Sequence, residues 1–121
     1  ESGIADVAYL NKILWIPGCM TPTEIHTAQM AGCTMIKLFP GNLLKPSYVE
    51  AIMPLFSGLD FLVTGGVDTT KESIESWFKA GVSGVGMGSK LITKEVLNSG
   101  DFTRLTQQTK DVMAIVKSVK K

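Results

Sequence analysis

A single lysine interrupts an apolar run near the middle of the chain. Residues 35–39 read MIKLF and are followed by a proline and a glycine, which predicts a short buried strand and its end. Because side chains alternate along a strand, Ile36 and Leu38 share one face and Lys37 lies on the other. A buried ammonium is costly, so such a lysine is paired, driven toward its neutral form, or used chemically. A neutral amine attacks carbonyl carbon, whereas a lysine at a frayed strand end keeps its head in water, and the pattern alone leaves both interpretations open.

Glycine-rich sequences follow two later apolar runs. Gly65 and Gly66 come directly after residues 61–64, and Gly88 and Ser89 follow the next run. In parallel α/β folds the carboxyl ends of the strands carry function, and glycines there let backbone N–H groups approach an anion. The alternative is that each pair only makes a tight turn into the next helix. Two such pairs on adjacent strands favour a phosphate site.

These candidates are positioned by a regular alternation of strands and helices. The predicted strands begin at Ile13, Met35, Phe61 and Val82, at intervals of 22, 26 and 21 residues. That spacing is typical of βα units and predicts an α/β protein with a parallel sheet. The expected strands are 13–16, 35–39, 61–64 and 82–87, and the expected helices are 4–12, 21–31, 47–53, 70–79, a short one to residue 97 and a long one from residue 101, with a loop over 42–46.

Four such units do not close a barrel, because they leave two apolar sheet edges that single domains normally protect. Eight units would close one. The sequence therefore indicates either the last four units of a (β/α)8 barrel or a small open, doubly wound sheet. The chain starts at Glu1 without a methionine, which suggests that translation begins elsewhere.

Composition excludes several classes of protein. With 121 residues, 45% hydrophobic, 19% charged and a net charge of +1, the chain is one globular domain or part of one, with no basic patch for nucleic acid. No apolar stretch is long enough to span a membrane, and no signal peptide is apparent. The two cysteines, Cys19 and Cys33, have neither metal-ligand spacing nor a disulfide framework, which suits the cytoplasm.

Other polar residues have simpler explanations. His26 is expected on a helix surface, Glu24 in a capping box, and Asp68 at a helix start. Cys19 lies in a loop at the carboxyl edge, but nothing near it in the sequence marks a nucleophile. Trp77 is expected in the core between helix and sheet.

Taken together, the motifs resemble one family in order and spacing. The 2-keto-3-deoxy-6-phosphogluconate (KDPG) and 4-hydroxy-2-oxoglutarate aldolases carry similar segments along essentially the whole chain. The segments are Ile16-Pro17-Gly18, Thr21-Pro22-Thr23-Glu24, Ile36-Lys37-Leu38-Phe39-Pro40, Thr64-Gly65-Gly66-Val67 and Gly86-Met87-Gly88-Ser89.

The resemblance implies a (β/α)8 TIM barrel, with residues 1–121 forming its C-terminal half as the last four βα units. It implies a class I aldolase, a lyase that works through a Schiff base on Lys37 with no metal or cofactor. It also implies a keto-acid phosphate as the small-molecule substrate and assembly as a homotrimer. The substrate-binding positions that it implies are Phe39 and Thr64 beside the substrate and Gly65, Gly66, Gly88 and Ser89 around its phosphate.

One part of the family's machinery has no counterpart here. The general base is a glutamate on an early strand, followed closely by an arginine that holds the substrate carboxylate, and both belong to the first half of the barrel. The chain is therefore expected to need a separate or missing N-terminal half for activity. Two further hypotheses remain: a half barrel that binds phosphosugars without an imine, and a non-catalytic assembly module.

Overall fold

The protein is built around a four-stranded parallel sheet. The computed structural model describes residues 2–120. Its strands lie in the order β1-β2-β3-β4, so each strand pairs with the next one in the chain. This arrangement confirms the predicted α/β class. The strands are β1 (Gly18–Cys19), β2 (Met35–Leu38), β3 (Asp60–Thr64) and β4 (Gly84–Gly86).

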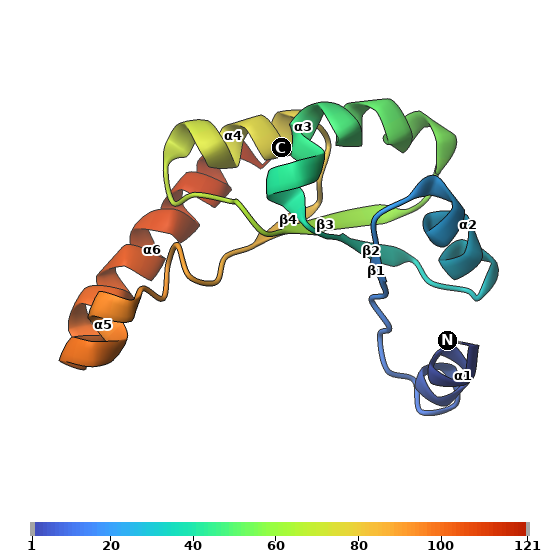
Figure 1. Ribbon diagram of the computed structural model, residues 1–121, viewed down its shortest axis with the longest axis horizontal. Coiled ribbons are helices and arrows are strands. Elements are labelled where there is room, and N and C mark those ends of the chain that lie inside the picture. Colours follow the sequence, from blue (N-terminus) through green and yellow to red (C-terminus); the bar gives the residue numbers. More distant parts are fainter. Residues whose placement is uncertain (1, 121) are drawn as a thin grey trace.

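Helices follow each strand, and most of them gather on one face of the sheet. Figure 1 shows α2, α3 and α4 on the same side of the strands, with α6 running beneath α4 and α1 set apart at the end of an extended segment. The helices are α1 (Ser2–Leu10), α2 (Pro22–Met30), α3 (Gly41–Ile52), the 3₁₀ turn η1 (Met53–Leu55), α4 (Lys71–Lys79), α5 (Lys94–Ser99) and α6 (Phe102–Val119).

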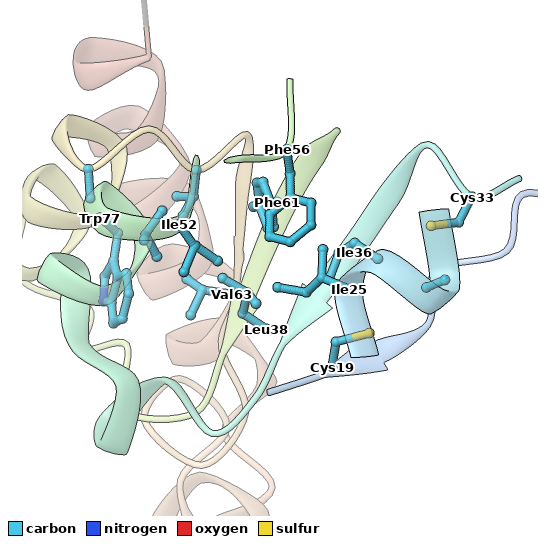
Figure 2. Close-up of a cluster of buried hydrophobic side chains, with 14 of the residues drawn as sticks. Cys19, Ile25, Cys33, Ile36, Leu38, Ile52, Phe56, Phe61, Val63 and Trp77 are labelled. Carbon is cyan, nitrogen blue, oxygen red and sulfur yellow. The ribbon is translucent and has the colours of Figure 1, made fainter. Parts of the chain in front are cut away.

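The hydrophobic core lies between the helices and one face of the sheet. Ile36 and Leu38 of β2 and Val63 of β3 are completely buried, and Trp77 of α4 packs into the same cluster, as predicted. Figure 2 shows these side chains converging from the strands and from the covering helices. Because the covered face takes Ile36 and Leu38, the alternation along β2 directs Lys37 to the opposite face.

The first strand is shorter and later than the sequence predicts. Residues 13–16 form no ladder, and Ile13 is 64% exposed. Only Gly18 and Cys19 pair with β2, opposite Lys37 and Leu38. The predicted strand over 13–16 is therefore wrong, because the apolar run is not the segment that pairs. The first paired residue, Gly18, lies two positions beyond the predicted strand.

The predicted loop over 42–46 is only partly right, because the chain is helical from Gly41 but leaves helical geometry at Lys45. Helix α3 starts at Gly41 and bends at Lys45, whose backbone adopts φ 64° and ψ 163° before Pro46. Pro46 correctly indicated the break at Lys45, but the sequence did not reveal the helical turn before it.

The predicted capping box at Glu24 is confirmed. Thr21 accepts a hydrogen bond from the Glu24 N–H, and the Glu24 carboxylate accepts one from the Thr21 N–H, which is a complete capping box. Thr70 caps α4 and Asp101 caps α6 through their side-chain oxygens. These caps set where the loops at the carboxyl edge of the sheet give way to helix.

Candidate active site

Lys37 lies in the middle of the uncovered face of the sheet. Its register partners are Gly18 on β1 and Leu62 on β3. The side chain is half-buried, and no carboxylate of the described chain forms an ion pair with it. The sequence left open that Lys37 forms a structural ion pair, and the structure shows no such pair within residues 2–120.

The Lys37 ammonium lies over an aromatic ring at the carboxyl edge. The Nζ atom is 5.3 Å from the centre of the Phe39 ring, within the range of a cation–π contact. Phe39 is 54% exposed, so its ring is accessible at this edge. The side chains of Lys37 and Phe39 thus lie next to each other, and together they extend from the open face of the sheet to its carboxyl edge.

A hollow beside these two side chains is the second part of the candidate site, and we call it the edge hollow. It has a volume of about 390 Å³ and lies where β3 and β4 end. Lys37 is not among its lining residues, so Phe39 is the link between the amine and the hollow. The edge hollow is lined by Phe39, Thr64, Gly65, Gly66, Val67, Gly86, Met87, Gly88, Ser89 and Lys90.

Gly65 and Gly66 are required by the fold itself. Both have positive φ, at 88° and 71°. A Cβ on Gly66 would lie 2.5 Å from the Cβ of Asn42, and one on Gly41 would lie 2.5 Å from the carbonyl oxygen of Gly65. The loops after β2 and β3 therefore pack backbone against backbone, and this explains the glycine pair without any ligand.

Gly88 differs from that pair. It has no positive φ, and a Cβ built on it would meet nothing within 4 Å. Nothing in the described chain requires a glycine there, although Gly88 lines the edge hollow. A glycine at position 88 therefore leaves room for a ligand to approach the backbone closely.

Unpaired polar groups also face this region. The Thr64 hydroxyl is buried without a hydrogen-bond partner in the described chain. The backbone N–H groups of Gly66, Ser89 and Lys90 donate to no backbone carbonyl among the hydrogen bonds of the described residues. Since native proteins satisfy nearly all buried polar groups, the Thr64 hydroxyl indicates a place for a ligand group. Gly66, Ser89 and Lys90 are exposed, and N–H groups at such loops can bind an anion.

Two features of the site were missed from the sequence. Lys90 lines the edge hollow, and the signal for it was a cation immediately after Gly88 and Ser89. The second is a brace near β1, in which the Tyr48 hydroxyl donates to the Met20 carbonyl over 2.7 Å. That bond joins α3 to the loop before α2, and no spacing in the sequence could reveal it.

Other candidates stay outside the site, as expected. His26 is exposed on α2. Cys19 is a buried free thiol, and burial raises its pKa, with the Glu24 charge adding to the effect. A raised pKa leaves less thiolate, so Cys19 is a poor nucleophile.

The described residues contain no group of three or more His, Cys, Asp or Glu side chains placed to hold a metal ion. None of the described helices is both long enough and apolar enough to cross a membrane.

The described residues combine a parallel βα sheet, a lysine on its open face and a hollow suited to an anion at its carboxyl edge. These features define an α/β protein with its candidate site at the carboxyl ends of the strands. The family model for KDPG and KHG aldolases matches residues 1–108, and the chain belongs to that family. The family expected from the motifs is therefore confirmed.

Named relatives agree with this assignment. Over 76 residues the chain is 40% identical to the 2-dehydro-3-deoxy-6-phosphogalactonate aldolase of Escherichia coli K12, covering 62% of this chain and 36% of that protein. Over 102 residues it is 31% identical to a probable 2-dehydro-3-deoxy-6-phosphogalactonate aldolase of Rhizobium meliloti 1021, covering 84% and 47%. The chain thus spans about half or less of the length of these curated relatives.

A solved structure described as native KDPGal superposes on the fold. The TM-score is 0.85 at 29% identity, covering 98% of this chain and 55% of the other. The four parallel strands and their helices therefore have the arrangement found in an aldolase structure.

Proposed function

We propose that residues 1–121 form the C-terminal half of a (β/α)8 class I aldolase barrel. The proposed reaction is cleavage of 2-keto-3-deoxy-6-phosphogluconate to pyruvate and glyceraldehyde 3-phosphate, with 4-hydroxy-2-oxoglutarate as a possible second substrate. The observation that carries the proposal is Lys37 on the open face of the sheet, with its Nζ over Phe39 and the edge hollow beyond.

The proposed chemistry needs the Lys37 amine in its neutral form. The amine attacks the C2 ketone, and loss of water gives a protonated imine. The imine accepts the electron pair of the C3–C4 bond as that bond breaks, while a base removes the C4 hydroxyl proton. Glyceraldehyde 3-phosphate leaves, C3 of the enamine is protonated, and water hydrolyses the imine to release pyruvate and the free amine.

The edge hollow supplies the phosphate site in this proposal. The N–H groups of Gly66 and Ser89 and the Ser89 hydroxyl bind the phosphate oxygens, and Gly65 and Gly88 allow the close approach. The Thr64 hydroxyl, which has no partner in the described chain, contacts the substrate nearer the imine.

The open face of the sheet supports the barrel proposal. Met35 and Leu62 are only half-buried there. Helix α1 exposes Tyr9 and Leu10 by 84% and 77%, and the segment between α1 and β1 exposes Leu14 by 63%. Apolar surface of this extent favours association. We propose that an N-terminal half supplies four further strands, the general-base glutamate and the carboxylate-binding arginine, that the complete enzyme is a cytoplasmic homotrimer, and that it uses no metal or cofactor.

The decisive experiment is borohydride trapping with pyruvate in the native assembly that contains this chain. Reduction of the imine fixes the pyruvate carbons on Lys37, and peptide mass spectrometry locates them. Lys37→Ala should abolish the adduct, whereas Lys71→Ala, which removes an exposed lysine at the start of α4, should leave it unchanged. An adduct at another lysine would refute the assignment, and phosphate binding without any adduct would select a non-catalytic phosphosugar-binding half barrel.

A further inference from the structure

Lys90 occupies a distinctive place at the edge hollow. It carries the one charged side chain among the lining residues drawn from the described chain. It lies in a single helical turn closed by the Leu91 and Ile92 N–H groups, which both donate to the Gly88 carbonyl at 2.9 and 2.8 Å. At the start of this turn, the Ser89 and Lys90 N–H groups donate to no backbone carbonyl of the described chain.

An ion pair holds the Lys90 ammonium beside the neighbouring loop. Its Nζ is 3.0 Å from Oδ1 of Asp68, which belongs to the loop between β3 and α4. The Asp68 N–H in turn donates to the Ser73 hydroxyl of α4 over 3.1 Å, which fixes the aspartate. The pair thus joins the two glycine loops of the edge hollow.

The pair leaves most of the ammonium available. The Lys90 and Asp68 side chains are 56% and 47% exposed, and such pairs contribute little to stability. An ammonium has three N–H donors, so one bond to Asp68 leaves others for an incoming anion. A lysine oriented in this way is suited to a doubly charged group at the hollow.

We propose that Lys90 is a phosphate-binding residue that makes the enzyme prefer phosphorylated keto acids over unphosphorylated ones, with Asp68 as its positioning residue. The identity of the substrate in this proposal rests on the proposed aldolase function, whereas the predicted affinity of Lys90 for phosphate does not. A phosphate dianion gains more from the ammonium than a single carboxylate does, since the interaction scales with charge. Removing Lys90 should therefore weaken binding of the phosphorylated substrate and leave imine chemistry intact.

The test compares Lys90→Gln, Lys90→Arg and the control Lys94→Gln in the native assembly that contains this chain. Lys94 is an exposed lysine of α5 outside the edge hollow. For the 6-phosphorylated keto acid, Lys90→Gln should raise KM roughly tenfold to a hundredfold with little change in kcat. KM for 4-hydroxy-2-oxoglutarate should change less than about threefold. Lys90→Arg should restore most of the loss, and Lys94→Gln should match wild type.

A phosphate titration separates this inference from the aldolase proposal. Inorganic phosphate is titrated into wild type and Lys90→Gln and followed by ³¹P NMR. Weaker phosphate binding in the variant supports the role of Lys90 even if neither keto acid is cleaved. Equal phosphate binding in the two proteins, or equal KM values for the phosphorylated substrate, would overturn the proposed role of Lys90. Neither result would affect pyruvate trapping at Lys37, which tests the aldolase proposal separately.

Discussion

The Nζ atom of Lys37 lies 5.3 Å from the centre of the Phe39 ring, although a fully buried leucine separates the two residues in the chain. Alternation along the strand brings the amine and the ring to the same side, while Leu38 anchors the strand in the core. The Phe39 ring lies at the carboxyl edge of the sheet, next to the Lys37 ammonium. It also lines the edge hollow, where the phosphate is proposed to bind.

Phe39→Leu should therefore affect the reaction more than the fold. The ring is 54% exposed, so the free energy of unfolding should change by less than about 1 kcal/mol. Loss of the aromatic contact with the substrate should lower kcat/KM about tenfold. Phe102→Leu, at a phenylalanine that is 65% exposed on α6, is the matched control and should change neither quantity. Steady-state kinetics and urea unfolding measure the two effects, and a large loss of stability in Phe39→Leu would contradict this view.

The glycines of the edge hollow should separate into structural and binding positions. Gly66→Ala should destabilise the protein by at least about 2 kcal/mol, because φ is 71° and the new Cβ would lie 2.5 Å from Asn42. Gly88→Ala should leave the melting temperature unchanged and raise KM for the phosphorylated substrate. Thermal unfolding and kinetics of both variants provide the comparison. Equal destabilisation by the two changes would show that Gly88 is also needed by the fold.

Lys45 is a site where a substitution should stabilise the protein. Its backbone, at φ 64° and ψ 163°, lies in a region that only glycine adopts without strain. Lys45→Gly should therefore raise the free energy of unfolding by about 1 kcal/mol. Lys45→Ala keeps the Cβ and should give no such gain. Urea unfolding of both variants would test this, and a stabilised alanine variant would mean that the lysine side chain rather than the backbone carries the cost.

Glu24 should make stability depend on pH in the acid range. Hydrogen bonds from the Met20 and Thr21 N–H groups lower its pKa below the ordinary value of 4.5 in the folded protein. A lowered folded-state pKa means that the stabilisation is full above pH 4.5 and is lost as the pH falls through the folded-state value. The stability difference between wild type and Glu24→Gln should thus shrink in acid. Urea unfolding across that range measures it, and a constant difference would exclude the carboxylate as the cause.

Much of the fold could be predicted because its signals are local. The apolar runs of β2 and β3, the caps at Thr21, Thr70 and Asp101, and the spacing of the units all depend on neighbouring residues. The prediction for 13–16 failed, and that for 42–46 missed the helical turn before Lys45, where pairing with β2 and the packing of Gly41 against the loop after β3 outweighed local propensity.

The amino-acid order by itself determined the family, the parallel βα plan and the identity of the candidate amine, because motifs and hydrophobic periodicity are written along the chain. Only the tertiary structure decided which glycines the backbone requires and which it leaves bare. It also decided that Lys90 joins Asp68 across two loops, 22 positions apart in the chain. Such relationships depend on distances between segments remote in sequence, which arise when strands align in a sheet and bring their loops to one edge.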